Sequence, residues 1–223
     1  MYINADFRTN GEYDFYTSIK NSIHTIFDIG CNKESLFTDF EGNVHYFDPV
    51  KSFIDQLKNQ PNKNSNAFFN VFGLGDNFEL SYYYPRYESF FNRIISCKDD
   101  DTNNRQILKL MRGDEYMSKN NIQNIDFLKI DTEGYEFKVL KGFGDKIRNI
   151  NIIQFEYGGT FLDNNTKLIE VIDYLKSYNF INFSYLTNEG LVDITDYTDH
   201  YNYCNIVCFN QLNYDNIKKL VYK

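Results

Sequence analysis

The chain carries the sequence IDFLKIDTEGYEFKVLKG at residues 125–142, and this stretch decides the fold. Its first third, IDFLKI, is apolar on both faces of an extended segment, as is typical of a strand buried between layers of helices. The last third, EFKVLK, spaces its apolar residues like one face of a helix, which we expect to end near Gly142 and Gly144. Asp131 and Glu133 lie in the turn between strand and helix. Ligands of open α/β sheets bind at such turns, so we expect both carboxylates to face a ligand.

Strands and helices alternate on both sides of this stretch, which is the signature of a parallel sheet with crossover helices. Before it, the patterns predict helices at residues 13–21, 34–40, 50–59 and 113–119, and strands at residues 24–29, 44–47, 68–72 and 78–84. After it, they predict a strand at residues 150–155, a helix around residues 168–175 capped by Asn164 or Asn165, and two strands at residues 180–186 and 203–209 that form a terminal hairpin.

The predicted fold is therefore a doubly wound α/β fold of the Rossmann-like type. We expect a mostly parallel, seven-stranded sheet with helices on both faces and an antiparallel strand or hairpin at the carboxyl end. A length of 223 residues without a Ser/Gly-rich linker predicts one domain over residues 1–223. Within it we expect an N-terminal helical segment at residues 1–22 and a substrate loop or lid at residues 78–112, whose stretch 95–104 is polar.

Composition narrows the class of partner and the compartment. The formal net charge is -8 and the basic residues are scattered, so the chain has no electrostatic footprint for nucleic acid. No apolar run approaches the roughly 18 residues of a membrane span, and we expect a cytoplasmic protein, or one of the host cytoplasm if the source is a virus. Four cysteines without a C-x-x-C pair predict reduced thiols. Cys204 and Cys208 could form a metal pair, but their offset along a predicted strand separates them by about 13 Å.

Glycines and carboxylates recur at the ends of the first three predicted strands. Asp28 lies at the end of the first strand and Gly30 just past it. Asp48 ends the second strand about 20 residues after Gly30, the offset at which a carboxylate meets the ribose of an adenosine ligand. The third strand leads into Gly73-Leu74-Gly75-Asp76, which suits an adenine pocket. No further glycine completes a G-x-G-x-x-G motif after Gly30, so the pattern favours an adenosine without phosphates.

On these motifs the chain resembles the FkbM-type S-adenosylmethionine-dependent methyltransferases. The matching residues are D-x-G-x-N at 28–32, F-D-P at 47–49, the turn at 73–76, the K-I-D-x-E-G-x-E and V-L-K-G pattern within 125–142, and IQFEY at 153–157. The resemblance covers residues 27–158. Two positions depart from the family pattern: Glu34 stands where a second glycine is usual, and MRGD at 111–114 stands where T-L-D is common.

The resemblance implies S-adenosylmethionine as cofactor. It implies that Asp28, Gly30 and Asn32 surround the methionine part, that Asp48 holds the ribose, and that residues 74–76 flank the adenine. The full predicted cofactor set is Asp28, Gly30, Cys31, Asn32, Asp48, Pro49, Gly73, Leu74, Gly75, Asp76 and Asp131.

Methyl transfer to oxygen requires a group that takes the proton of the acceptor hydroxyl. The predicted catalytic candidates are Asp131, Glu133, Glu156 and His200, and the predicted substrate-binding residues are Tyr84, Arg86, Glu133, Gly134 and Tyr135. Asp131 and Glu156 could instead hold a divalent cation, although a metal is not predicted. The structural alternatives are that Asp131 and Glu133 merely begin a helix and that Asp48 caps one.

The predicted function is O-methylation of a sugar in a surface glycan or in its activated precursor, an acceptor class that the family implies. Two alternatives remain open. The acceptor could be phosphoryl-linked, a lipid or another small molecule, with its anion bound by Arg86, Arg93, Arg105 or Arg112. Alternatively, Glu34 in the cofactor loop could mark a non-catalytic scaffold that keeps the fold.

Overall fold

The computed structural model describes residues 6–61, 66–78, 80–83, 106–212 and 214. Four residues named in the sequence analysis lie outside these ranges: Tyr84, Arg86, Arg93 and Arg105. Cys97, one of the four cysteines, lies outside them as well. The polar stretch 95–104 lies outside them too. In the part of the chain that is described, no helix has the length and apolarity that crossing a membrane requires.

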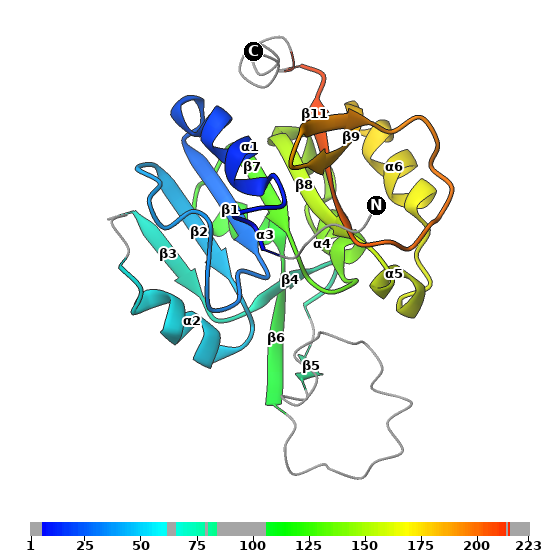
Figure 1. Ribbon diagram of the computed structural model, residues 1–223. Helices are drawn as coiled ribbons and strands as arrows, with labels where there is room; N and C mark the ends of the chain where they lie inside the picture. Colours follow the sequence, from blue (N-terminus) through cyan, green and yellow to red (C-terminus); the bar gives the residue numbers. More distant parts are fainter. Residues whose placement is uncertain (1–5, 62–65, 79, 84–105, 213, 215–223) are drawn as a thin grey trace.

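An eight-stranded sheet forms the centre of the molecule (Figure 1). Its order is β10-β9-β11-β8-β7-β1-β2-β3. The strands are β1 Thr25–Ile29, β2 Asn43–Phe47, β3 Ala67–Asn70, β7 Ile125–Ile130, β8 Ile150–Tyr157, β9 Phe180–Thr187, β10 Gly190–Asp193 and β11 Cys204–Asn210. Neighbours from β3 to β8 are parallel, whereas β11, β9 and β10 are antiparallel to their neighbours. The doubly wound fold is thus confirmed, with one strand more than expected.

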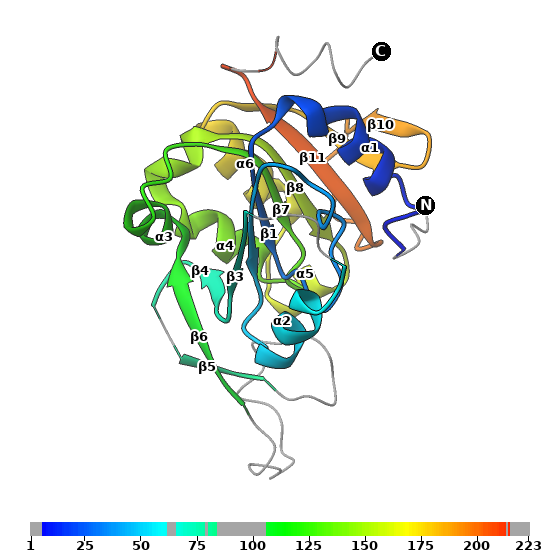
Figure 2. The same cartoon turned by 90° about the vertical axis from the view of Figure 1, so that its left-hand side faces the viewer.

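Helices cover both faces of this sheet. They are α1 Glu12–Ile19, α2 Lys51–Lys58, α3 Gly113–Lys119, α4 Glu136–Gly142, α5 Thr160–Asp163 and α6 Leu168–Ser177, with 3-10 turns η1 Lys20–Ser22 and η3 Gly144–Asn149. One apolar cluster joins α3, α4 and α6 to one face, and a second joins α1 and α2 to the other. Figure 2 shows α3 and α4 on the opposite side of the sheet from α1. The central parallel strands β1, β7 and β8 are therefore buried on both faces, which explains their mostly apolar sequences, whereas the edge strand β3 is partly exposed.

A smaller sheet, β4-β6-β5, lies beside the large one (Figure 1). It consists of β4 Gly73–Gly75, β5 Leu80–Tyr83 and β6 Gln106–Arg112. The prediction of one strand over residues 68–72 that leads into a glycine turn was wrong in its bounds. β3 ends at Asn70, and the glycine turn is itself the strand β4, parallel to β6.

Residues 34–40 form turns instead of the predicted helix. The reason is local hydrogen bonding by Ser35, whose hydroxyl donates to Asp28 Oδ2 and accepts from the Phe37 amide. Serine side chains that bond nearby groups in this way compete with helix formation.

The last helix and the terminal hairpin also differ from prediction. The N-cap of α6 is Lys167, not Asn164 or Asn165, and its amide donates to Glu170 Oε2 at 2.9 Å. β9 does pair antiparallel with β11, but the hairpin partner of β9 is β10, which lies between the two predicted strands.

Candidate functional site

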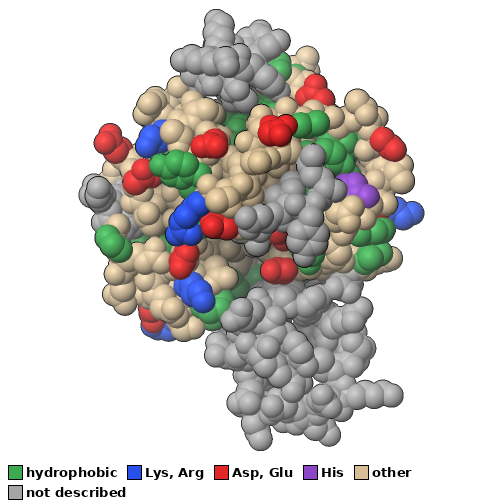
Figure 3. All heavy atoms as spheres, in the orientation of Figure 1, with side chains coloured by type: hydrophobic (Ala, Val, Ile, Leu, Met, Phe, Trp, Pro, Cys, Tyr) green, Lys and Arg blue, Asp and Glu red, His purple; other side chains and the backbone are tan. Residues whose placement is uncertain are grey.

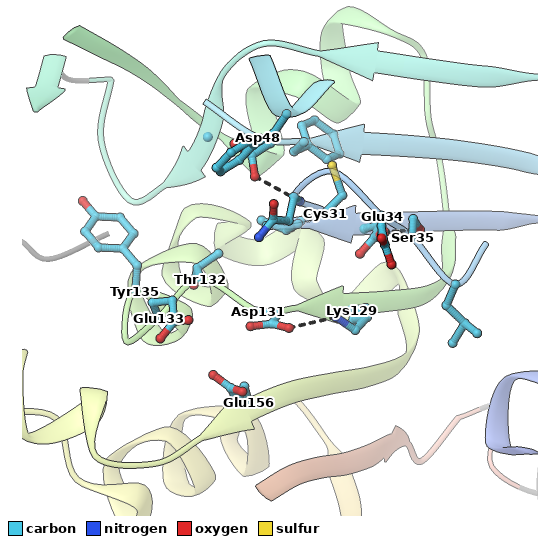
Figure 4. A pocket seen from close by; sticks show the side chains of 18 of the residues that line it. Cys31, Glu34, Ser35, Asp48, Lys129, Asp131, Thr132, Glu133, Tyr135 and Glu156 are labelled. Carbon is cyan, nitrogen blue, oxygen red and sulfur yellow. Dashed lines mark hydrogen bonds and ion pairs between the residues drawn. The ribbon is translucent and has the colours of Figure 1, made fainter. Parts of the chain in front are cut away.

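A cavity of about 470 Å³ opens at the carboxyl ends of β1, β2, β7 and β8 (Figure 4). This volume lies in the usual range for small-molecule sites. Figure 3 shows acidic side chains near the middle of this face of the molecule. The cavity is lined by residues from eight parts of the chain: Phe7, Asn10 and Glu12; 28–32 and 34–36; 47–50 and Phe53; Gly73 and Leu74; Leu110; Lys129, 131–133 and Tyr135; Glu156; and 203–205.

The loop after β1 is tied directly to the turn after β7. Gly30 has φ 78, and a Cβ on it would lie 1.8 Å from the carbonyl oxygen of Asp131. The amides of Gly30 and Cys31 both donate to the carbonyl oxygen of Phe47, at 2.9 and 3.2 Å. Only glycine allows this approach of the two backbones, so the two predicted halves of the site meet at Gly30.

Asp48 organises the loop from the neighbouring strand. Its Oδ2 accepts from the Asn32 amide at 3.1 Å and its Oδ1 accepts from the Val50 amide at 2.8 Å. Burial raises the pKa of Asp48 to about 6, against the lowering effect of these two hydrogen bonds. Because α2 begins after Val50, Asp48 is not its N-cap. Its oxygens remain able to accept further hydrogen bonds from the cavity.

Asp28 is the most deeply buried carboxylate in the cavity wall, with 2 % of its surface exposed. Ser35 donates to Oδ2 at 2.5 Å, whereas Oδ1 has no hydrogen-bond partner among the described residues. Burial raises the pKa of Asp28 to about 6. An unsatisfied buried oxygen in a cavity wall is costly unless a ligand donates to it.

Three carboxylates gather at the other side of the cavity. Asp131 follows β7 and Glu156 lies on the neighbouring strand β8, as expected, because Ile130 pairs with Phe155. In Figure 4, Glu133 lies to the left of Asp131 and Glu156 lies below it. Burial, followed by repulsion from Asp131, raises the pKa of both Glu133 and Glu156, and the effect on Glu156 is much larger.

Glu136 holds the turn that presents Glu133. Glu133 has φ 55 and Gly134 has φ 99, and a left-handed conformation is strained for a glutamate. Glu136 is fully buried, and its Oε1 accepts from the Thr132 amide, the Thr132 hydroxyl and the Gly134 amide at 2.8, 3.0 and 3.2 Å. These bonds hold the turn in its strained conformation.

Lys129 supplies the positive charge among the lining residues that the structure describes. Its Nζ lies 3.1 Å from Asp131 Oδ2 and 3.9 Å from Glu12 Oε2. Burial acts to lower the pKa of Lys129, but the carboxylates of Asp131, Glu12 and Asp28 outweigh it and raise that pKa. The lysine is therefore a permanent cation.

The structure brings most of the predicted cofactor set together. In the cavity wall are Asp28, Gly30, Cys31, Asn32, Asp48, Pro49, Gly73, Leu74 and Asp131. Gly75 and Asp76 are not among the lining residues. The carbonyl of Gly75 packs against Gly142, and Asp76 lies 3.8 Å from Lys141.

Some of the predicted catalytic and substrate-binding residues line the cavity, and others do not. Asp131, Glu133, Tyr135 and Glu156 line the cavity, whereas Gly134 faces Thr160 and His200 lies elsewhere. His200 contacts the ring of Tyr157, and its Nε2 lies 3.0 Å from the Tyr185 hydroxyl. The described residues contain no group of three or more His, Cys, Asp or Glu side chains that could hold a metal ion. Cys204 and Cys208 are buried free thiols.

Sequence reasoning gave no role to four residues that shape the site: Glu12, Ser35, Lys129 and Glu136. Two of them carried a signal, because Lys129 and Glu136 belong to the K-I-D-x-E-G-x-E pattern within residues 125–142. The contacts of Glu12 with β7, β8 and β11 join segments far apart in the sequence, which no local pattern predicts.

Comparison with known proteins gives a family and a fold. The family model "Methyltransferase FkbM domain" matches residues 28–181. No curated protein matches the chain.

Two solved structures are among those that resemble the chain. A TehB-like S-adenosylmethionine-dependent methyltransferase from Corynebacterium glutamicum has a TM-score of 0.50 and 11% identity, over 91% of this chain and 88% of that one. A putative methyltransferase from Streptococcus mutans, solved with SAH, has a TM-score of 0.48 and 9% identity, over 89% and 94%. At these identities the likeness concerns the fold alone.

Proposed function

The chain belongs to the FkbM methyltransferase family, and we propose that it transfers a methyl group from S-adenosylmethionine to a hydroxyl of a sugar in a surface glycan or its activated precursor. The observation that carries this proposal is a cavity whose wall joins Asp28 and Asp48 on one side to Asp131, Glu133 and Glu156 on the other.

The cofactor side of the cavity has the donors and acceptors that S-adenosylmethionine needs. The unpartnered Oδ1 of Asp28 would accept from the ammonium group of the methionine part. Asp48 would accept from the ribose hydroxyls, and Leu74 would pack against the adenine. When bound, the cofactor supplies an electrophilic methyl group. The cradle needs Gly30, because a side chain there would strike the Asp131 backbone.

On the acceptor side the three carboxylates have different chemistry. The strongly raised pKa of Glu156 keeps it protonated near neutral pH, so it would orient an acceptor oxygen and not remove a proton. Asp131 is engaged by Lys129 at 3.1 Å. Glu133 is half-buried in the cavity wall, and burial raises its pKa, which makes it a stronger base than an exposed glutamate. Glu133 would therefore take the hydroxyl proton as the acceptor oxygen bonds to the methyl carbon and the methyl–sulfur bond breaks, with S-adenosylhomocysteine as the leaving group.

The alternatives receive less support. Of the arginines that could bind a phosphoryl group, Arg112 is paired with Asp114 at 2.6 Å and does not line the cavity, and the others lie outside the described residues. Glu34, the basis of the scaffold alternative, lies 3.7 Å from Arg8 at the exposed rim. It leaves the backbone geometry at Gly30 intact.

The test is incubation of the protein with a panel of glycans and nucleotide sugars and methyl-labelled S-adenosylmethionine, with the label located by mass spectrometry. We expect label on oxygen. Glu133→Gln should lower turnover by about 10²-fold or more while S-adenosylhomocysteine still binds. Glu189→Gln, an exposed change between β9 and β10, is the matched control. Label on nitrogen or carbon alone, or no cofactor binding at millimolar concentration, contradicts the proposal.

A further inference from the structure

A row of polar side chains crosses the sheet face that α1 covers. In the strand register Asp28 lies beside Lys129, and Lys129 lies beside Gln154, so β1, β7 and β8 each place one polar residue at the same level. Two residues earlier, the same strands place Ile26, Phe127 and Ile152 in the apolar cluster beneath α1. The polar row therefore borders an apolar face, where charges are costly unless they are paired.

Glu12, in the first turn of α1, is the group that reaches this row from the helix. It is 5 % exposed, and its Oε2 accepts from Gln154 Nε2 at 2.7 Å and lies 3.9 Å from Lys129 Nζ. Its Oε1 accepts from Asn10 Nδ2 at 2.7 Å and from Asn205 Nδ2 at 3.2 Å. Both oxygens are thus held, and the carboxylate has a fixed position.

Lys129 lies between this carboxylate and the cavity. Its side chain is 12% exposed, and Figure 4 shows its ion pair with Asp131 in the cavity wall. Asp28, its neighbour on β1, is the carboxylate with the unpartnered oxygen. The buried cation of Lys129 therefore lies among three carboxylates. They are Glu12 of the N-terminal helix, Asp28 on the cofactor side and Asp131 on the acceptor side.

We propose that Glu12 and Lys129 are positioning residues for methyl transfer: Glu12 fixes Lys129 where its charge serves both Asp28 and Asp131. This inference rests on the proposed function, which places those two aspartates beside the cofactor and the acceptor. Glu12 precedes residues 28–181, which match the family model. The N-terminal helix α1 then contributes a positioning residue to the site, although the helix lies outside the region that matches the family model.

The two positioning residues act on Asp28 with opposite sign. Lys129 lowers the pKa of Asp28, whereas Glu12 raises it, within a net rise that burial dominates. The titratable and charged groups around Asp28 are Lys129, Asp131, Glu12, Asp48, Cys31 and Tyr46. Removing the lysine charge should therefore move the titration of Asp28 to higher pH, and removing the glutamate charge should move it to lower pH.

The experiment measures S-adenosylhomocysteine binding by calorimetry from pH 5 to 8. The wild-type affinity should fall as Asp28 becomes protonated. Lys129→Met should raise the midpoint of this fall by about one pH unit, and Glu12→Gln should lower it by a smaller amount. Lys129→Arg, which keeps the charge, should leave the midpoint near that of the wild type.

The matched controls are Lys119→Met and Glu115→Gln, an exposed pair on α3 at 3.8 Å, and neither should move the midpoint. A purely structural role would weaken binding in both site variants without opposite shifts, so equal or absent shifts overturn the inference. If Lys129→Met does not fold, the Glu12→Gln variant still tests the inference, because an unchanged midpoint in that variant is enough to overturn the inference. Failure of the wild type to bind at any pH contradicts the proposed function itself.

Discussion

At the scale of single residues, Gly30 decides whether the two halves of the site can meet. Gly30→Ala places a Cβ 1.8 Å from a backbone oxygen, and no side-chain rotation relieves that contact. We expect the free energy of unfolding to fall by about 3 kcal/mol or more and S-adenosylhomocysteine binding to be lost. Urea unfolding and calorimetry measure both effects.

Gly190 is the matched control for this prediction. Its φ of 110 is also left-handed, but a Cβ there meets no atom of the described chain within 4 Å. Gly190→Ala should therefore cost only the backbone strain, about 1 kcal/mol, with cofactor binding unchanged. Equal losses in the two variants would mean that strain, and not the contact with Asp131, makes Gly30 necessary.

Glu136 offers a second prediction at this scale, because burial raises its pKa from 4.5 to about 7. When the pKa of a carboxyl group is higher in the folded state than in the unfolded state, protonation stabilises the fold. This stabilisation is complete at pH values below the unfolded-state pKa and is lost as the pH rises through the folded-state pKa. Glu136→Gln keeps an acceptor oxygen for Thr132 and Gly134 but cannot ionise. Between pH 5 and 8 the stability of the variant should therefore rise relative to the wild type by about 2 to 3 kcal/mol.

Urea unfolding of both proteins at the two pH values measures this change. Glu115→Gln, at an exposed position of α3, is the control, and its difference from the wild type should not depend on pH. A Glu136→Gln difference that stays constant from pH 5 to 8 would show that Glu136 does not ionise in this range.

At the scale of elements, the sequence predicted the helices and strands whose apolar pattern follows from burial against the sheet. The strand IDFLKI is β7, and the predicted helix at residues 113–119 is α3. The failures have physical causes outside such patterns. β10 is a mostly exposed edge strand without an apolar alternation, and residues 34–40 were diverted from a helix by the bond from Ser35 to Asp28. In the site, strand-end carboxylates were predictable from position, whereas the partners of Lys129 depend on how α1 packs.

Asp199 carries a prediction at this scale, because this loop residue joins two elements, β8 and α6. Its Oδ1 accepts from the Tyr157 hydroxyl of β8 at 3.0 Å and from the Leu168 amide at the start of α6 at 2.8 Å. Asp199→Ala leaves both donors without this acceptor, and we expect a loss of about 2 to 3 kcal/mol in urea unfolding. Asp196→Ala, which removes bonds only to the exposed Thr198, should leave stability unchanged within error. Equal stability of the two variants would contradict the role of Asp199.

At the scale of the whole molecule, the carboxylates of the site make the protein less stable as the pH rises, which is opposite to the usual effect of carboxylates. The raised pKa values of Asp28 and Asp48, about 6, and of Glu136 and Glu156 all give stability that is lost as the pH rises. His45 acts oppositely at lower pH, because burial lowers its pKa from 6.5 to about 4, and its contribution is lost as the pH falls below 6.5.

The two effects separate between pH 6.5 and 8.5, because folded His45 is neutral throughout this window and the loss of the remaining proton from unfolded His45 changes the stability by only about 0.4 kcal/mol. In this window Glu136 and Glu156 still bind protons in the folded state that the unfolded chain has lost, so the free energy of unfolding should fall by about 3 kcal/mol. Urea unfolding with an unchanged m-value measures the fall as a lower midpoint. The fall should be smaller in Glu136→Gln, because one of the two groups no longer titrates. A flat or rising stability over this window would mean that both carboxyls are already ionised at pH 6.5, and Glu156 could then no longer be a protonated partner of the acceptor.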